Sequence, residues 1–278
     1  MHFSGNFRID FFCKKVLEFP ERNHIIAARK YIGRLRPRMG GILLQNIEQI
    51  KEQICDVCHK MWQLGWVASN DGNVSARLED GRILATPTGM SKAYITPETL
   101  ILMDLAGNVL EAGEGYRPSS EIKMHLRCYQ KRDDVFGVVH AHPPGATGFA
   151  VAHKAMDMYN MIESVVTVGS VPLTPYGTPS TMEVPDAIEP YLEEHDVMLL
   201  ENHGALAVGT SLLTAFYRME SLELWAKTTI NAVILGGSCD ISRENIEKIL
   251  NLRSYYHVTG RHPGYKLYQD DPMLHKTE

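Results

Sequence analysis

Two histidines separated by a single residue offer the clearest chemistry in this 278-residue sequence. His140 and His142 end the apolar run at residues 138–142 and are followed directly by Pro143 and Pro144. Because side chains alternate along a strand, both imidazoles would face one side and form a chelate for a divalent metal ion. The prolines would end the strand at a sheet edge, where a metal can keep an open coordination position. A chance H-x-H pair is common in a chain with 12 histidines, so the pair alone leaves metal binding open.

A third candidate ligand, His203, lies in the turn sequence Asn202-His203-Gly204 between two apolar runs. Three histidines around an open position form a ligand set found in catalytic zinc sites. A solvated turn residue would fit the same sequence, so both interpretations stand at this point.

A carboxylate for proton transfer is offered by Glu121, which follows Ser119 and Ser120. The run at residues 117–121 indicates a helix start, since serine caps helices and a glutamate in the first turn complements the helix dipole. A carboxylate there can bind a metal ion or move a proton. Capping of the helix is the alternative role that the same residues allow.

Three short stretches rich in glycine and hydroxyl groups could together form an anion pocket. They are residues 71–75 (Asp-Gly-Asn-Val-Ser), 86–91 (Thr-Pro-Thr-Gly-Met-Ser) and 118–120 (Pro-Ser-Ser). Glycine lets the backbone approach a phosphate closely, and the serines at a helix N-terminus add N–H groups. Each stretch alone is an ordinary turn, and the set is neither a P-loop nor a dinucleotide fingerprint.

The elements that must position these residues alternate irregularly between helix and strand. Several hairpins among them predict an α/β fold: a three-layer α/β/α sandwich with a central mixed, largely antiparallel sheet. The expected helices are at residues 43–64, from 121 onward, at 187–195 and at 212–235; the expected strands are at 73–77, 82–85, 135–142, 165–168, 197–200 and 205–208, with a further pair around 106–108 and a long loop at 172–185.

The composition, with 44% hydrophobic and 22% charged residues, is that of a soluble globular protein. No run of about 18 apolar residues suggests a membrane span, and the first residues lack the order of a signal peptide. We therefore expect a cytoplasmic enzyme with no membrane partner. Its five scattered cysteines should be free thiols. Cys55-x-x-Cys58-His59 matches a haem-attachment pattern, which we reject because the export signal is missing and both cysteines fit a helix face.

Charge divides the sequence into two parts. Residues 1–40 hold nine Lys/Arg and three acids, whereas the remainder holds 19 basic and 30 acidic residues. We interpret 1–42 as a basic N-terminal extension and 43–278 as the catalytic domain. The extension could be ordered, could be a flexible tail that binds nucleic acid or another partner, or could be upstream sequence outside the mature protein. The acidic main domain argues against nucleic acid as its partner.

Five motifs, taken in order, resemble the class II aldolase/adducin family, and most closely its L-fuculose-1-phosphate aldolase-like branch. They lie at residues 71–75, 86–89, 119–121, 140–144 and 202–205, and the likeness extends from about 43 to about 237. Five ordered motifs are far more specific than any one of them. The resemblance implies a single mixed-sheet α/β/α sandwich, assembled as a homotetramer with active sites between neighbouring subunits.

The same resemblance implies roles for individual residues. Zn²⁺ would be held by His140, His142 and His203, with Glu121 as the general acid/base that also touches the resting metal. Three imidazoles suit other divalent ions as well. The reaction would cleave a ketose 1-phosphate, a small phosphorylated sugar, into dihydroxyacetone phosphate and an aldehyde. The phosphate pocket would use Gly72, Asn73, Thr88, Gly89, Ser119 and Ser120.

Departures from the family pattern leave the second proton donor and the substrate open. Relatives use a tyrosine from a neighbouring subunit, and Met161 falls there, with Tyr159 and Glu163 close by. Tyr255 or Tyr256 matches a C-terminal tyrosine of the family weakly. The Ser-Ser-Glu motif favours an aldolase over a ribulose-phosphate 4-epimerase, whose motif is Ser-Ser-Asp. A methylthioribulose-phosphate dehydratase-like enzyme would have similar metal and phosphate sites, and a non-catalytic, adducin-like scaffold would keep the fold without the activity.

Overall fold

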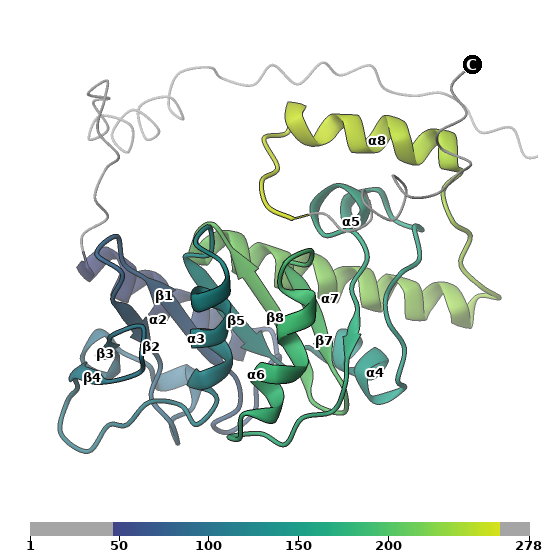
Figure 1. Cartoon of the computed structure of the whole chain (residues 1–278). Helices are drawn as coiled ribbons and strands as arrows, with labels where there is room; N and C mark the ends of the chain where they lie inside the picture. Colours follow the sequence, from purple (N-terminus) through teal and green to yellow (C-terminus); the bar gives the residue numbers. More distant parts are fainter. Residues whose placement is uncertain (1–46, 262–278) are drawn as a thin grey trace, which may run out of the picture. The chain divides into compact units, whose positions relative to one another are not determined.

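The computed structural model describes residues 47–261, so the predicted extension at 1–42 lies outside the described residues and stays a prediction. Within them, eight strands form one sheet with the order β4-β3-β2-β1-β5-β8-β7-β6 (Figure 1). Neighbouring strands are antiparallel except β6 and β7, which run parallel. The predicted mixed, largely antiparallel sheet is confirmed. The strands are β1 (Asn73–Arg77), β2 (Ile83–Ala85), β3 (Ile101–Met103), β4 (Val109–Glu111), β5 (Gly137–Ala141), β6 (Leu173–Thr174), β7 (Val197–Leu200) and β8 (Gly204–Gly209).

Helices pack on both faces of this sheet and complete the predicted three-layer sandwich (Figure 1). α2 (Ile47–Gln63) and α7 (Leu212–Ile234) cover one face, and α3 (Ile122–Lys131) and α6 (Glu183–Ile188) cover the other. No helix within residues 47–261 combines the length and the apolar character needed to cross a membrane. The remaining α-helices described are α4 (Pro144–Val151), α5 (Ile162–Thr167) and α8 (Arg243–Tyr255), with short 3-10 helices at Lys92–Tyr94, Pro97–Thr99 and Glu189–Tyr191.

Strand alternation divides the side chains of the central strands between two cores. On β5, Val139 packs in the core beneath α2 and α7, whereas Val138 packs beneath α3 and α6. His140 has the parity of Val138 and therefore faces α3. On β1, Val74 belongs to the first core, so Asn73, which pairs with His140 across the strands, also faces α3. The polar residues of both strands thus gather on one face.

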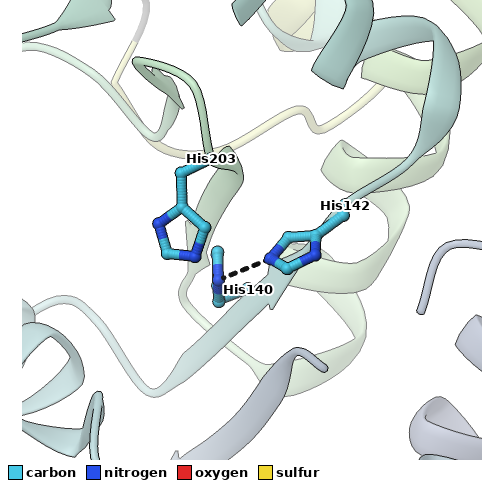
Figure 2. Close-up of side chains that lie close together, drawn as sticks. All are labelled: His140, His142 and His203. Atoms are coloured by element: carbon cyan, nitrogen blue, oxygen red, sulfur yellow. Dashed lines mark hydrogen bonds between the residues drawn. The ribbon is translucent and has the colours of Figure 1, made fainter. Parts of the chain in front are cut away.

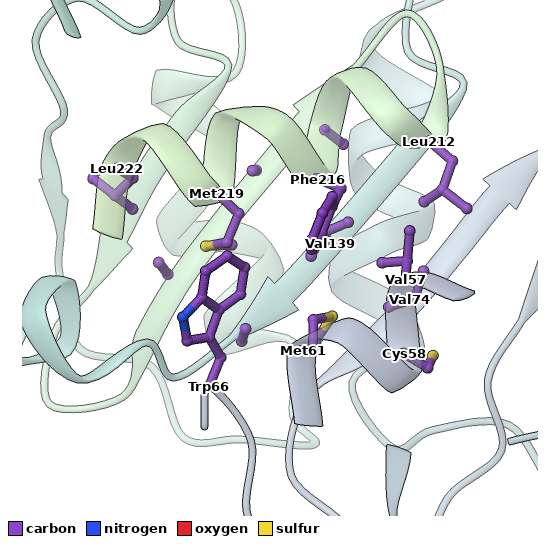
Figure 3. Close-up of a cluster of buried hydrophobic side chains, with 14 of the residues drawn as sticks. Val57, Cys58, Met61, Trp66, Val74, Val139, Leu212, Phe216, Met219 and Leu222 are labelled. Atoms are coloured by element: carbon purple, nitrogen blue, oxygen red, sulfur yellow. The ribbon is translucent and has the colours of Figure 1, made fainter. Parts of the chain in front are cut away.

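The first core holds the two cysteines of the rejected haem pattern. Figure 3 shows Cys58 with Val57 and Met61 of α2 in the same cluster as Phe216 and Met219 of α7. Cys55 and Cys58 are free thiols buried on the core face of α2. Burial raises the pKa of the Cys55 thiol to about 11, which keeps it protonated at neutral pH.

The strand predicted at residues 165–168 is wrong, because these residues lie in α5 and at its C-terminal end. Val165 and Val166 are β-branched and favour strands by propensity, but they pack against Ile246 and Ile249 of α8. Packing of this kind overrides an intrinsic preference. α8 itself was not predicted.

Two further differences concern prolines and loops. Pro144 does not open a loop but is the first residue of α4, a position where proline is favoured because its missing N–H is not needed. The loop expected at 172–185 contains β6 and the start of α6. The helix expected at 187–195 is shorter and lies earlier, as α6 and the 3-10 helix Glu189–Tyr191.

A buried ion cluster ties β7 to α3 and α7. Asp196 Oδ1 accepts from Arg132 Nη1 at 2.5 Å, and Asp196 Oδ2 lies 2.8 Å from Arg218 Nη2. The three side chains are at most 4% exposed. Removing the one carboxylate would leave two buried guanidinium groups without this partner, and such a loss is strongly destabilising.

We expect Asp196→Ala to lower the free energy of unfolding by about 3–5 kcal/mol. Urea denaturation followed by circular dichroism measures this change. The matched control is Asp186→Ala, because Asp186 pairs with Arg127 but is 65% exposed. The control should lose no more than about 1 kcal/mol. Equal losses in the two variants would contradict the structural role given to the buried cluster.

Candidate functional site

Three histidine side chains converge at one end of the central strands, as Figure 2 shows. The ring centroids of His140, His142 and His203 are 4.7–5.0 Å apart in pairs. One ring nitrogen from each lies within 4.8 Å of the others. His140 belongs to β5, His142 follows that strand, and His203 comes from the turn between β7 and β8. The structure thus brings together the three residues that the sequence predicted.

Strand pairing and a tight turn place these rings. β5 pairs with β8, so the turn that precedes β8 lies beside the end of β5. In that turn Asn202 has a φ of 54°, a left-handed conformation that asparagine tolerates. Gly204 is needed because a Cβ there would lie 2.5 Å from His142 Cδ2 and 2.6 Å from the Ala141 carbonyl oxygen. Close backbone contact therefore holds His203 near His142.

The histidine nitrogens that face one another are suited to bind a cation. His140 is fully buried and its Nδ1 donates to the Ala205 carbonyl at 2.9 Å, which leaves the lone pair on Nε2. Burial, and then the neighbouring His203 and His142, lower the pKa of His140 well below its usual value. Burial and then His203 lower the pKa of His142. Neutral imidazole is the form that binds metal ions.

The Nε2 atoms of His140 and His142 lie 3.3 Å apart. Asp71 Oδ2 lies 3.6 Å from His142 Nδ1 and favours a proton on that nitrogen. The lone pairs on the two Nε2 atoms would then face each other. They would repel each other unless a positive charge lies between them. The residues present therefore fit a divalent metal ion.

Glu121 completes the cluster. Its Oε2 lies 3.5 Å from His140 Nε2 and its Oε1 lies 3.4 Å from His203 Nε2. Glu121 is the N-cap residue of α3, but its side chain makes no capping hydrogen bond. Among the described residues, buried Glu121 Oε1 and His203 Nδ1 have no hydrogen-bond partner. A carboxylate that faces imidazole nitrogens and does not cap its helix has the placement of a metal ligand or a proton carrier.

The three glycine- and hydroxyl-rich stretches meet in a cavity of about 180 Å³ beside the histidines. Backbone hydrogen bonds join them, since Thr86 N donates to Val74 O and Ser119 N donates to Thr86 O. At Gly72, a Cβ would lie 2.9 Å from the His140 carbonyl oxygen. The lining residues are Asn70, Asp71, Gly72, Asn73, Pro87, Thr88, Ser119, Ser120, Glu121, His142, Pro179 and His203.

Five of the six predicted phosphate-pocket residues line this cavity, whereas Gly89 lies in the same turn but is not among the lining residues. Sequence reasoning missed Asn70 and Pro179 as lining residues. Asn70 directly precedes a motif that was recognised. Pro179 comes from the region expected to be a long loop at 172–185, and nothing in the sequence marked this proline as a lining residue.

The residues considered for a second proton donor lie elsewhere in the described chain. Tyr159, Met161 and Glu163 do not line the cavity around Glu121. Tyr159 packs against the α5–α8 cluster, and Met161 is the N-cap residue of α5. Tyr255 and Tyr256 are exposed at the end of α8. Any role for these residues in catalysis stays a prediction.

Comparison with known proteins gives the family. Residues 52–230 match the Class II Aldolase and Adducin N-terminal domain. The chain belongs to the class II aldolase and adducin family. It is similar to the L-fuculose phosphate aldolase of Methanococcus maripaludis strain C7, at 30% identity over 60% of this chain and 88% of that protein. It is also similar to the 3-oxo-tetronate 4-phosphate decarboxylase of Haemophilus influenzae, at 32% identity over 64% of this chain and 85% of that protein.

Solved structures show the same fold. One described as L-fuculose 1-phosphate aldolase has a TM-score of 0.68 and 28% sequence identity, and the match covers 76% of this chain and 98% of that one. This member of the class II aldolase and adducin family therefore carries a histidine cluster of the kind that forms a divalent-metal site, and it has the predicted α/β architecture.

Proposed function

We propose that this protein is a cytoplasmic, Zn²⁺-dependent lyase that cleaves a ketose 1-phosphate into dihydroxyacetone phosphate and an aldehyde. The observation that carries the proposal is the position of the Glu121 carboxylate, 3.4–3.5 Å from nitrogens of two histidines. The same carboxylate lines a cavity rich in hydroxyl groups. The relatives named L-fuculose phosphate aldolase support a substrate that resembles L-fuculose 1-phosphate.

The phosphate group would bind in the cavity beside Gly72, Asn73, Thr88, Ser119 and Ser120. Backbone N–H groups and hydroxyls at the start of α3 are good donors for a phosphate, and the helix N-terminus adds a favourable dipole. The chain has a net charge of −5, so phosphate recognition would depend on these local donors rather than on the field of the whole protein.

Glu121 would carry the proton of the reaction. A divalent cation held by His140, His142 and His203 would supply Lewis acidity that stabilises negative charge on the substrate's ketone and neighbouring hydroxyl oxygens. When the carbon–carbon bond next to the ketone breaks, its electron pair stays on the carbon beside the carbonyl, and Glu121 would protonate that carbon. In the synthetic direction Glu121 would remove the same proton.

A second proton must leave the hydroxyl beyond the breaking bond as that carbon becomes the aldehyde. Glu163 could accept this proton as a carboxylate, and Tyr159 could donate one in the synthetic direction. Both flank Met161, where the family's tyrosine falls. In the proposed homotetramer this region would come from a neighbouring subunit. The assembly and this assignment are both parts of the proposal.

A decarboxylase is the second candidate, because one relative at 32% identity is named 3-oxo-tetronate 4-phosphate decarboxylase. Loss of CO₂ next to a ketone leaves an electron pair on the same kind of carbon, so Glu121 could serve either reaction. An epimerase, a dehydratase and a non-catalytic scaffold would share the fold. The metal-binding histidines and Glu121 argue against the scaffold.

Product analysis separates these functions. Purified protein would be incubated with Zn²⁺ and a panel of ketose 1-phosphates, and separately with 3-oxo-tetronate 4-phosphate. We expect dihydroxyacetone phosphate and an aldehyde from at least one ketose 1-phosphate. Release of CO₂ from the tetronate alone would establish the decarboxylase instead. An epimer would indicate an epimerase, a dehydrated diketone a dehydratase, and metal-free protein without turnover a scaffold.

A further inference from the structure

A chain of buried hydrogen bonds leads from α3 through β1 to Glu121. Tyr129 Oη lies 2.8 Å from Ser75 Oγ, and Ser75 Oγ lies 2.7 Å from His125 Nδ1. On the other side of the ring, His125 Nε2 lies 2.5 Å from Asn73 Oδ1. The Asn73 amide then donates from Nδ2 to Glu121 Oε2 at 2.9 Å. Of these residues, only Glu121 has a role in proton transfer in the proposed function.

Two periodicities bring these residues together. Glu121, His125 and Tyr129 are spaced by four along α3 and therefore share one face of that helix. Asn73 and Ser75 are spaced by two along β1 and share the strand face that looks toward α3. A polar stripe on the helix thus meets a polar pair on the strand inside an otherwise apolar layer.

The hydrogen bonds have only one consistent direction. A carboxylate accepts, so Asn73 must present its N–H₂ group to Glu121 and its Oδ1 to His125. His125 must then carry its proton on Nε2, which leaves Nδ1 to accept from the Ser75 hydroxyl. Ser75 in turn accepts from the Tyr129 hydroxyl. Each donor meets an acceptor in this arrangement, and the direction runs from Tyr129 to Glu121.

Burial makes this arrangement costly to break. Ser75, His125 and Tyr129 are fully buried, and Asn73 is 4% exposed. Burial lowers the pKa of His125 to about 3, so the ring is neutral at physiological pH and offers one donor and one acceptor. An unsatisfied polar group at such a site carries its full desolvation cost.

We propose that His125 is a positioning residue that fixes the Asn73 amide with its N–H₂ group, and not its carbonyl oxygen, toward the Glu121 carboxylate. The inference rests on the proposed function, in which Glu121 moves a proton. Ser119 Oγ accepts from the same Asn73 Nδ2 at 3.2 Å, a contact that is compatible with this orientation. With the amide turned over, Oδ1 would face the carboxylate, and repulsion between the two acceptors would move Glu121 away from His140 and His203.

The test compares two variants at one position. His125→Phe keeps an aromatic ring and loses the donor, whereas His125→Gln keeps an N–H group able to reach Asn73. The Glu121 step is measured by NMR as uptake of deuterium from D₂O into dihydroxyacetone phosphate. We expect His125→Phe to slow this exchange by about 100-fold with KM and bound metal unchanged, as for a catalytic group displaced by about 1 Å. His125→Gln should regain most of the loss.

The inference would be overturned if the wild type takes up deuterium and the metal-loaded His125→Phe variant takes it up equally fast. Absence of exchange in the wild-type protein would instead count against the proposed function. A second measurement needs neither substrate nor a variant: nitrogen-15 NMR of the histidine rings at neutral pH. We expect the Nε2–H tautomer at His125. An Nδ1–H tautomer would overturn the inference, whatever the protein catalyses.

Discussion

We expect that replacing His140 with alanine will remove the bound metal and, with it, the proposed lyase activity. His140 Nε2 lies 3.3 Å from His142 Nε2, and Nε2 carries the lone pair because Nδ1 donates to the Ala205 carbonyl. Loss of a residue that only orients a metal ligand already costs about 10–100-fold in metal affinity, so loss of the ligand itself should exceed about 100-fold. Metal content by mass spectrometry and isothermal titration with Zn²⁺ measure the change.

The control for this variant is His257→Ala, because His257 is exposed and lies outside the histidine cluster. The control should keep one metal ion per chain and its turnover. Circular dichroism of metal-free His140→Ala should show the folded chain, which separates loss of a ligand from loss of the fold. Full metal occupancy in His140→Ala would contradict the assignment of this residue as a ligand.

Glu121→Gln should separate proton transfer from metal binding. Glutamine keeps the size of the side chain and an oxygen that can accept from Asn73, and the three histidines remain. It cannot accept a proton as a carboxylate does. We therefore expect the metal content to stay near that of the wild type while kcat falls by about 10²–10⁴-fold, the usual contribution of a general acid/base. A steady-state assay of dihydroxyacetone phosphate release gives kcat.

Glu244→Gln is the matched control, since Glu244 is 79% exposed on α8 and pairs only with surface Lys248 among the ion pairs of the described residues. Its kcat should equal that of the wild type. Unchanged turnover in Glu121→Gln would remove Glu121 from the mechanism. Loss of metal together with turnover would instead make this carboxylate a ligand that the histidines cannot replace.

The sequence predicted that His140 and His142 would lie together because alternation along one strand is a strong local rule. His140 and His142 needed only that rule, and the structure confirms that they face the same side. His203 needed the pairing of β5 with β8, a long-range contact that no local pattern contains. The five motifs supplied it by resemblance. The same holds for Glu121, whose capping alternative only the structure removes.

Other parts of the molecule depend on packing that the sequence does not display. The Val165-Val166 pair favours a strand by its residue types, yet the contact with α8 makes it helical. The hydrogen bonds that join Ser75 to His125 and His125 to Asn73 arise where α3 packs on β1. Spacing of four on the helix and two on the strand was present in the sequence, but nothing in it showed that the two polar faces meet.

In the proposed site, His140, His142 and His203 hold one divalent metal ion next to Glu121. Anomalous X-ray diffraction at the zinc absorption edge, from crystals grown with Zn²⁺, locates the bound metal. We expect one strong anomalous peak per chain, about 2.0–2.1 Å from a ring nitrogen of each histidine. Absence of a peak there, or zinc bound at another group of residues, would contradict the proposed site.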